Sequence, residues 1–194
     1  ALPAGGGAAG CARHPMEPPA LTMPSPALRR PDFSLSPLAR NVLLIAGSAL
    51  AAASVIALIR LALGLAPATA AVRDVAILVH LGTVLPALPL GMVLFLARKG
   101  TRSHKALGWI WMALMAVTAV AALFIRELNG GSFSLIHLFV PLTFFGIVRG
   151  VSAARQGRIA AHRRSMIGLF FGALLVAGIL SFLPGRVMWV WLTG

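Results

Sequence analysis

The chain has 194 residues, of which 59% are hydrophobic and only 11% are charged. Soluble domains carry about a quarter charged residues, so this composition excludes an ordinary soluble protein and predicts an all-α integral membrane protein. The net charge is +13, but the basic residues gather at the ends of apolar segments instead of forming one patch, which argues against a nucleic-acid partner.

The beginning of the chain differs in composition from the rest. Residues 1–38 are rich in Gly, Ala and Pro without any apolar period, which predicts a disordered cytoplasmic tail. Within it, Met16 or Met23 is a candidate for the true start. A cleaved signal peptide is the competing interpretation, but the first apolar run begins only near Asn41 and is long enough to span a membrane. Residues 39–194 form the predicted transmembrane domain.

Crossing a hydrocarbon core of roughly 30 Å takes about 20 apolar residues. Five segments meet that length, and the sequence therefore predicts five transmembrane helices. Their predicted ranges are 41–65, 74–97, 104–126, 133–153 and 162–183. The second segment contains Pro86 and Pro89, which a transmembrane helix tolerates as a kink. The last apolar residues, 187–192, are too few to cross and are expected at the interface.

Lys and Arg are distributed unevenly between the two sides of the predicted topology. The tail and the loops after the second and fourth helices hold Arg13, Arg29, Arg30, Arg40, Arg98, Lys99, Arg102, Lys105, Arg149, Arg155, Arg158, Arg163 and Arg164. The opposite side holds only Arg73, Arg126 and Arg186. The positive-inside rule then predicts a multi-pass protein of the bacterial inner (plasma) membrane, with a cytoplasmic N-terminus and the C-terminus outside.

Four of the predicted spans carry a histidine near one end, and an ionisable residue at membrane depth marks a functional site by default. On the predicted topology His80 and His137 share the outer level, whereas His104 and His162 share the cytoplasmic level. A low-spin b-type haem takes two axial imidazole nitrogens from facing helices. We therefore expect two haems, with iron ligands His80 and His137 at one and His104 and His162 at the other. Helices two to five would form an up-and-down four-helix bundle around them.

Each of these residues also has a plainer interpretation. A single histidine at a helix end is more often satisfied by water or backbone, and His104 and His162 also suit contact with lipid headgroups. Arg60, inside the first span, needs a partner, and we expect Arg60 and Arg126 to bind the propionates of the outer haem. Arg126 beside Glu127 has the alternative of a loop ion pair.

Other motifs are few. Gly146 and Gly150, and likewise Gly168 and Gly172, match the small-xxx-small pattern of packed membrane helices. With only four acidic residues, the chain offers no row of membrane carboxylates, which argues against a proton-coupled transporter.

Several stretches within residues 77–188 resemble the uncharacterised bacterial membrane-protein family catalogued as domain of unknown function 2306. The matching stretches are VHLGTVLPALPLG, KGTRSHKALGWIW, FSLIHL and AAHRRSMIGLFFGALLVAG, and they close with LPGR. The four-histidine, four-helix layout also resembles the cytochrome b-561 class, which implies that His80 pairs with His137 and His104 with His162. That class normally has a sixth helix, with no counterpart among the five predicted spans, so its substrates are not carried over.

Together these features predict a transmembrane di-haem b-type electron-transfer protein with two bis-histidine sites. A quinone or small reductant is the expected partner besides the lipid bilayer, and whether the protein is an oxidoreductase enzyme stays open. The alternative is a cofactor-free accessory or structural subunit of a larger membrane complex, in which the histidines face lipid or a neighbouring subunit.

Overall fold

The computed structural model describes residues 35–125 and 135–194, and over these residues the chain is helical and contains no β-strand. The all-α class is therefore confirmed. The helices are α1 (Pro37–Ala62), η1 (Ala70–Arg73), α2 (Val75–Leu96), α3 (Arg102–Phe124), η3 (Leu135–Leu138), α4 (Phe139–Arg155), α5 (Ile159–Ile167), η4 (Gly168–Val176), α6 (Ala177–Leu180) and α7 (Val187–Thr193).

Four helices of the described chain are long and apolar enough to cross a membrane: α1, α2, α3 and the continuous helix Ile159–Leu180, which α5, η4 and α6 form together. Four of the five predicted spans are thus confirmed as helices of spanning length. The remaining one, α4, has 17 residues, so its length is about 26 Å against a core of roughly 30 Å. The short 3-10 turn η3 precedes it, and the predicted beginning of this span, residue 133, lies outside the described residues.

Side-chain caps explain where the helices begin. Ser36 accepts a hydrogen bond from the Ala39 backbone N–H (3.2 Å), and Asp74 and Thr101 cap α2 and α3 in the same way. At the α4–α5 turn Gly157 has a φ of +70°, a conformation that glycine adopts without strain. These caps and turns lie near the residues where the predicted spans begin or end, so each histidine stays close to the end of its helix.

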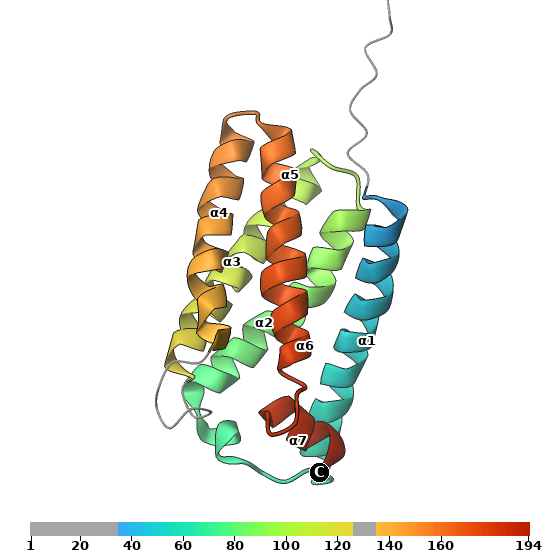
Figure 1. Ribbon diagram of the computed structural model, residues 1–194, viewed down its shortest axis with the longest axis vertical. Helices are drawn as coiled ribbons and strands as arrows, with labels where there is room; N and C mark the ends of the chain where they lie inside the picture. Colours follow the sequence, from blue (N-terminus) through green and yellow to red (C-terminus); the bar gives the residue numbers. More distant parts are fainter. Residues whose placement is uncertain (1–34, 126–134) are drawn as a thin grey trace, which may run out of the picture. The chain divides into compact units, whose positions relative to one another are not determined.

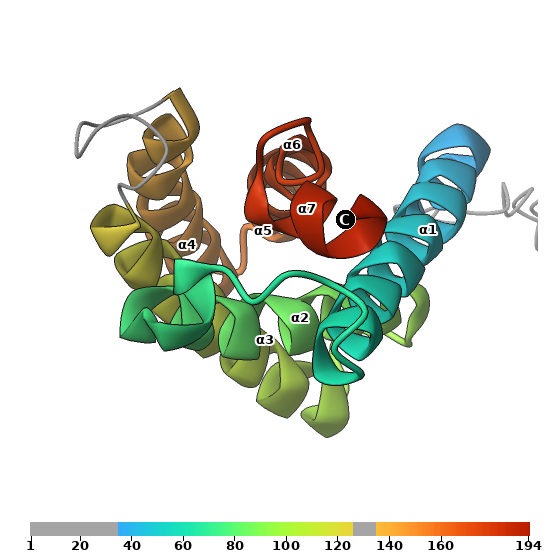
Figure 2. The same cartoon turned by 90° about the horizontal axis from the view of Figure 1, so that it is seen from below.

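Consecutive long helices run in opposite directions (Figure 1). Helix α2 packs along α3, α4 packs along α5, and α1 contacts α2 and α7. Seen along the helices, α5 to α6 lies between α1 and α4 and faces α2 and α3 (Figure 2). One end of this arrangement carries the α2–α3 and α4–α5 turns and is here called the basic end. The other, which carries η1 and α7, is the α7 end.

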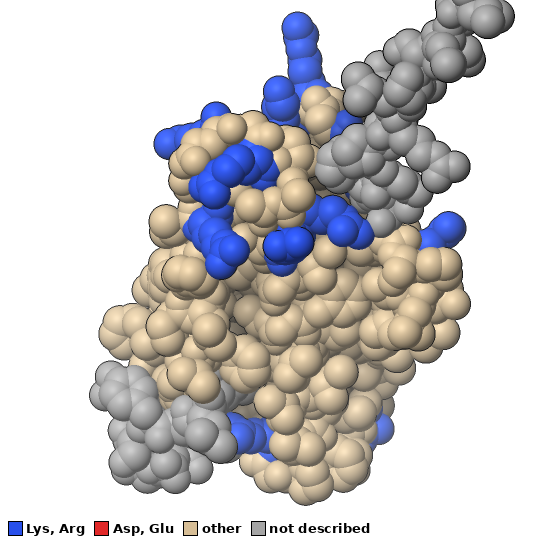
Figure 3. Space-filling model, turned by 45° about the horizontal axis from the view of Figure 1, so that its top comes forward, with Lys and Arg blue, Asp and Glu red and all other residues tan. Residues whose placement is uncertain are grey.

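Charged and apolar side chains are distributed unevenly over the surface of the described helices. Lys and Arg gather at the basic end, while the flanks below are almost free of them (Figure 3). These residues are Arg40, Arg98, Lys99, Arg102, Lys105, Arg149, Arg155, Arg158, Arg163 and Arg164. Many large apolar side chains on the flanks are exposed, among them Ile45, Phe145 and Val148 at 63–72%. Such a surface is suited to lipid rather than water.

A tightly packed centre lies between the two ends. Trp111 is 2% exposed and donates its Nε1–H to the Ala87 carbonyl oxygen at 2.9 Å. A Cβ atom at Gly91 would come within 2.7 Å of the Phe170 ring, which is itself fully buried. Glycine at position 91 therefore allows Trp111 and Phe170 to pack directly on the backbone of α2. Along α2 this centre is about 16 Å from His80.

Candidate functional site

A cavity at the α7 end contains both histidines of the predicted outer pair. It has a volume of about 220 Å³, and its walls are mostly apolar side chains from α1, α2, α3, α4, η4, α6 and α7. His80 and His137 both line it. His80 comes from the second turn of α2, and His137 from η3 just before α4, so residues far apart in the sequence line the same cavity.

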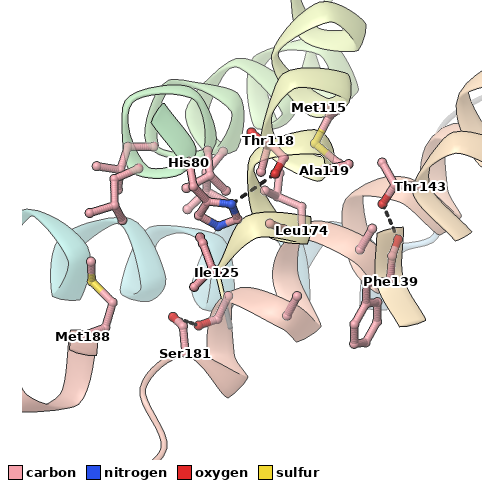
Figure 4. Close-up of a pocket in the computed structure, with 18 of the residues that line it drawn as sticks. His80, Met115, Thr118, Ala119, Ile125, Phe139, Thr143, Leu174, Ser181 and Met188 are labelled. Carbon is pink, nitrogen blue, oxygen red and sulfur yellow. Dashed lines mark hydrogen bonds between the residues drawn. The ribbon is translucent and has the colours of Figure 1, made fainter. Parts of the chain in front are cut away.

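The His80 imidazole has a fixed orientation. Its Nδ1 lies 3.1 Å from the backbone carbonyl oxygen of Thr118 on α3 (Figure 4). A carbonyl oxygen only accepts hydrogen bonds, so Nδ1 carries the proton and Nε2 carries the lone pair. Histidines that bind metals usually have their second nitrogen held in this way by a carbonyl or carboxylate. The neighbouring hydroxyls of Thr83 and Thr118, 2.7 Å apart, tie α2 to α3 at the same height.

His137 is more deeply enclosed. It is 8% exposed and is one of four buried polar residues in the described chain. The other three, Ser54, Thr118 and Thr143, also line the cavity. Ser54 and Thr143 donate their hydroxyls to carbonyl oxygens of their own helices at 2.8 and 2.7 Å. These two hydroxyls are thus satisfied within their own helices.

Arg186 is a cavity residue that the sequence did not single out. It lies in the turn between α6 and α7 and lines the cavity. Its Nη1 atom is buried and has no hydrogen-bond partner among the described residues. A buried guanidinium N–H without an acceptor is costly. Its position in the cavity wall would suit an anionic or carbonyl acceptor. A lone arginine in a short turn gives no periodic signal from which this could be predicted.

Arg60, by contrast, does not line the cavity. Its Nε donates to the carbonyl oxygen of Trp191 at 3.3 Å, and its Nη2 donates to Leu65 (3.2 Å) and to Gly194. The guanidinium therefore caps the carboxyl end of α7 and fastens it to α1. The predicted need of Arg60 for a partner is met by backbone oxygens. Arg126, the other predicted propionate partner, lies outside the described residues.

The second predicted pair lies at the basic end. His162 Nδ1 is 2.9 Å from the Gly150 carbonyl oxygen, so its proton is on Nδ1 and its lone pair on Nε2, as for His80. His104 is half-buried, and its Nδ1 is buried without a hydrogen-bond partner in the described chain. The two imidazoles lie within electrostatic range of each other, and Lys99 lies within range of His104. The members of the outer pair thus line one cavity, and those of the second pair lie within electrostatic range of each other.

The described residues contain no group of three or more His, Cys, Asp or Glu side chains placed to hold a metal ion. Two axial nitrogens are what a low-spin haem iron takes from the protein, whereas structural zinc takes four ligands.

The comparison with known families and the apolar composition both indicate a membrane protein. The family described as predicted membrane proteins (DUF2306) matches residues 77–191, and the chain belongs to this family. The matched range includes all four histidines as well as Arg186. No curated protein and no solved structure matches the chain. The resemblance drawn from the sequence motifs is confirmed, while the family description states no activity.

Proposed function

We propose that this protein carries single electrons across a membrane through two b-type haems, one held by His80 and His137 and the other by His104 and His162. The observation that supports this best is that His80 and His137, from separate helices, line one cavity. The second pair lies near the other end of the same helices. From His104 to Thr118, whose carbonyl holds His80, α3 rises about 21 Å.

The proposal includes the topology that such a carrier needs. Five crossing helices, of which α2, α3, α4 and α5 to α6 form an up-and-down bundle, would place the two pairs near opposite membrane faces. Lys and Arg at the basic end support a cytoplasmic orientation for that end in a bacterial inner membrane. The amino-terminal end of α1 lies at the basic end (Figure 1), so the N-terminus would be cytoplasmic.

The donor chemistry fits the group. His80 and His162 each have Nδ1 bound to a backbone carbonyl, which leaves Nε2 as the ligand atom. A bound haem supplies a one-electron couple whose potential the protein tunes through ligands, nearby charge and burial. At the α7 end the unsatisfied Nη1 of Arg186 would bind a haem carboxylate, a role the sequence had assigned to Arg60 and Arg126.

The size of the cavity sets a further requirement. Sites that enclose drug-sized ligands have roughly 300–1,000 Å³, and this cavity has about 220 Å³. Flexible side chains in its wall must therefore move when a macrocycle enters. Met115 and Met188, 2% and 6% exposed, are well suited to this because methionine adapts its shape easily. A quinol or a small reductant would donate electrons at one face.

A visible spectrum tests the proposal. The protein is purified after expression with added haem, its dithionite-reduced minus oxidised spectrum is recorded, and the pyridine haemochrome assay gives the haem content. We expect a b-type α-band and about two haems per chain. A colourless protein under these conditions overturns the proposal and favours a cofactor-free accessory subunit of a larger membrane complex.

A further inference from the structure

A second hollow lies between α4 and α5 to η4 and is here called the α4–α5 groove. It has a volume of about 320 Å³, which falls within the roughly 300–1,000 Å³ of small-molecule sites. Its walls are apolar and include Leu142, Phe145 and Leu169. Leu142 and Phe145 are 53% and 63% exposed, so the groove is open to the surroundings of the helices rather than closed inside them.

The groove has two arginines at one end. Arg149 of α4 and Arg164 of α5 line it, and both belong to the basic end. From Arg149 the groove follows α4 as far as Phe139, which corresponds to about 15 Å of helix. This length is half of a hydrocarbon core of roughly 30 Å, or one leaflet. The groove thus has about the length of one lipid chain and carries a pair of cations at its end.

The two arginines have no acidic partner in the described chain. Asp74 is the only acidic residue in the ranges 35–125 and 135–194, and it caps α2 at the α7 end. Arg149 lies 6.0 Å from the centre of the Phe145 ring, a cation–π contact that leaves its N–H groups available. Arg149 and Arg164 are both exposed, so their charges are accessible to an external anion.

Three glycines line the groove, and two of them, Gly168 and Gly172, are not used in helix packing within the described chain. A Cβ atom added at Gly168 or Gly172 would meet nothing within 4 Å, whereas one at Gly146 would meet Leu169 at 2.7 Å. The predicted packing role thus holds for Gly146 but not for the Gly168–Gly172 pair. A second copy of the chain is a poor occupant of this space, because it would bring its own basic end against Arg149 and Arg164.

We propose that the α4–α5 groove binds one anionic phospholipid from the leaflet at the basic end. Its acyl chain lies along the apolar walls beside Gly168 and Gly172, and its phosphate lies between Arg149 and Arg164. This inference is independent of haem binding, because no residue of the histidine pairs lines the groove.

The charge component is tested by native mass spectrometry of the purified full chain, titrated with phosphatidylglycerol or with phosphatidylcholine of the same acyl chains. Each basic residue near an anionic headgroup contributes about fivefold in affinity. The variant R149Q/R164Q should therefore bind phosphatidylglycerol about 30-fold more weakly, with phosphatidylcholine unchanged. The control R158Q, which removes the same kind of charge outside the groove, should change neither affinity by more than about twofold. Equal losses in R149Q/R164Q and R158Q would overturn the proposal.

The shape component needs a second variant. G172L fills the groove and should remove tight phosphatidylglycerol binding, while the control G108L, on α3, should leave it intact because a Cβ there also meets nothing within 4 Å. Glycerol 3-phosphate has the anion without the acyl chains, and it should compete only weakly. Full competition by glycerol 3-phosphate, or a dimer that G172L abolishes while lipid binding persists, would contradict a lipid site.

Discussion

The two ends of the helices hold the same pair of residues in different surroundings. At the α7 end His80 and His137 line a mostly apolar cavity with Arg186 as the cation in its wall. At the basic end His104 and His162 are half-buried, and Lys99 interacts with His104. The comparison teaches that one sequence signal, a histidine near a helix end, leads to enclosed surroundings where apolar helices converge and to more open surroundings where charged turns are near.

The largest effect should come from the ligands of the enclosed site. H80A should reduce the haem content from about two per chain to about one, because a single imidazole does not hold a low-spin haem in place. The haemochrome assay measures this directly. S54A is the matched control, since Ser54 lines the same cavity but donates its hydroxyl to Leu50 of its own helix. Retention of two haems in H80A would show that His80 is not a ligand.

The packed centre that separates the two ends offers the next effect. G91A places a methyl group against the buried rings of Phe170 and Trp111, and such overpacking costs about 1–3 kcal/mol. G82A, on the same helix, meets nothing within 4 Å and should instead stabilise by about 0.5–1 kcal/mol through helix propensity. Thermal unfolding in detergent, followed by circular dichroism, compares the two variants. Similar melting temperatures would mean that the contacts of Gly91 with Phe170 and Trp111 are looser than the structure shows.

Substitution of Arg186 distinguishes the two ends, because it should lower haem affinity at the α7 end and leave the basic end unchanged. R186Q removes a buried N–H without an acceptor, so the free energy of unfolding of the haem-free protein should stay equal or rise by about 1 kcal/mol. Haem affinity at the α7 end should fall about tenfold, the equivalent of one charge-assisted hydrogen bond. Chemical denaturation of the apoprotein measures the free energy of unfolding, and haem titration measures the affinity, with R186K as the conservative control. An equal loss at both ends would contradict a local role for Arg186.

The smallest effect is expected at Arg60. R60L breaks the hydrogen bonds to Trp191, Leu65 and Gly194 that fasten α7 to α1. Because these bonds are partly exposed, we expect a loss of about 1 kcal/mol in the free energy of unfolding, with the haem content unchanged. Chemical denaturation together with the haemochrome assay checks both points. If R60L lost a haem, Arg60 would have to contribute to haem binding after all.

Much of the fold follows from composition and from end signals. The long apolar runs and the caps Ser36, Asp74 and Thr101 place the long helices near their predicted ranges. The length of α4 is less predictable, since apolarity continues through Leu135–Leu138 while the backbone there forms a 3-10 turn. Hydropathy measures solubility in lipid and does not distinguish the two backbone geometries.

Alternation of helix direction predicted which histidines share an end of the helices, and the described structure has His80 and His137 at the α7 end and His104 and His162 at the basic end. The arginines of the α7 end were less predictable. Arg60 attracted attention because it lies inside a span, yet its partners are the carbonyls of α7, a contact between the first and last helices that no local pattern encodes. Arg186 needed the fold of the α6–α7 turn before its place in the cavity wall was visible.

The most direct test of the account is the haem content of two double variants compared with the unmodified protein. H80A/H137A removes both ligands of one site and should retain about one haem per chain, with the b-type α-band preserved. H80A/H104A removes one ligand from each site and should retain none. If the two double variants have the same haem content, the four histidines do not act as two separate pairs, and the proposed electron path is wrong.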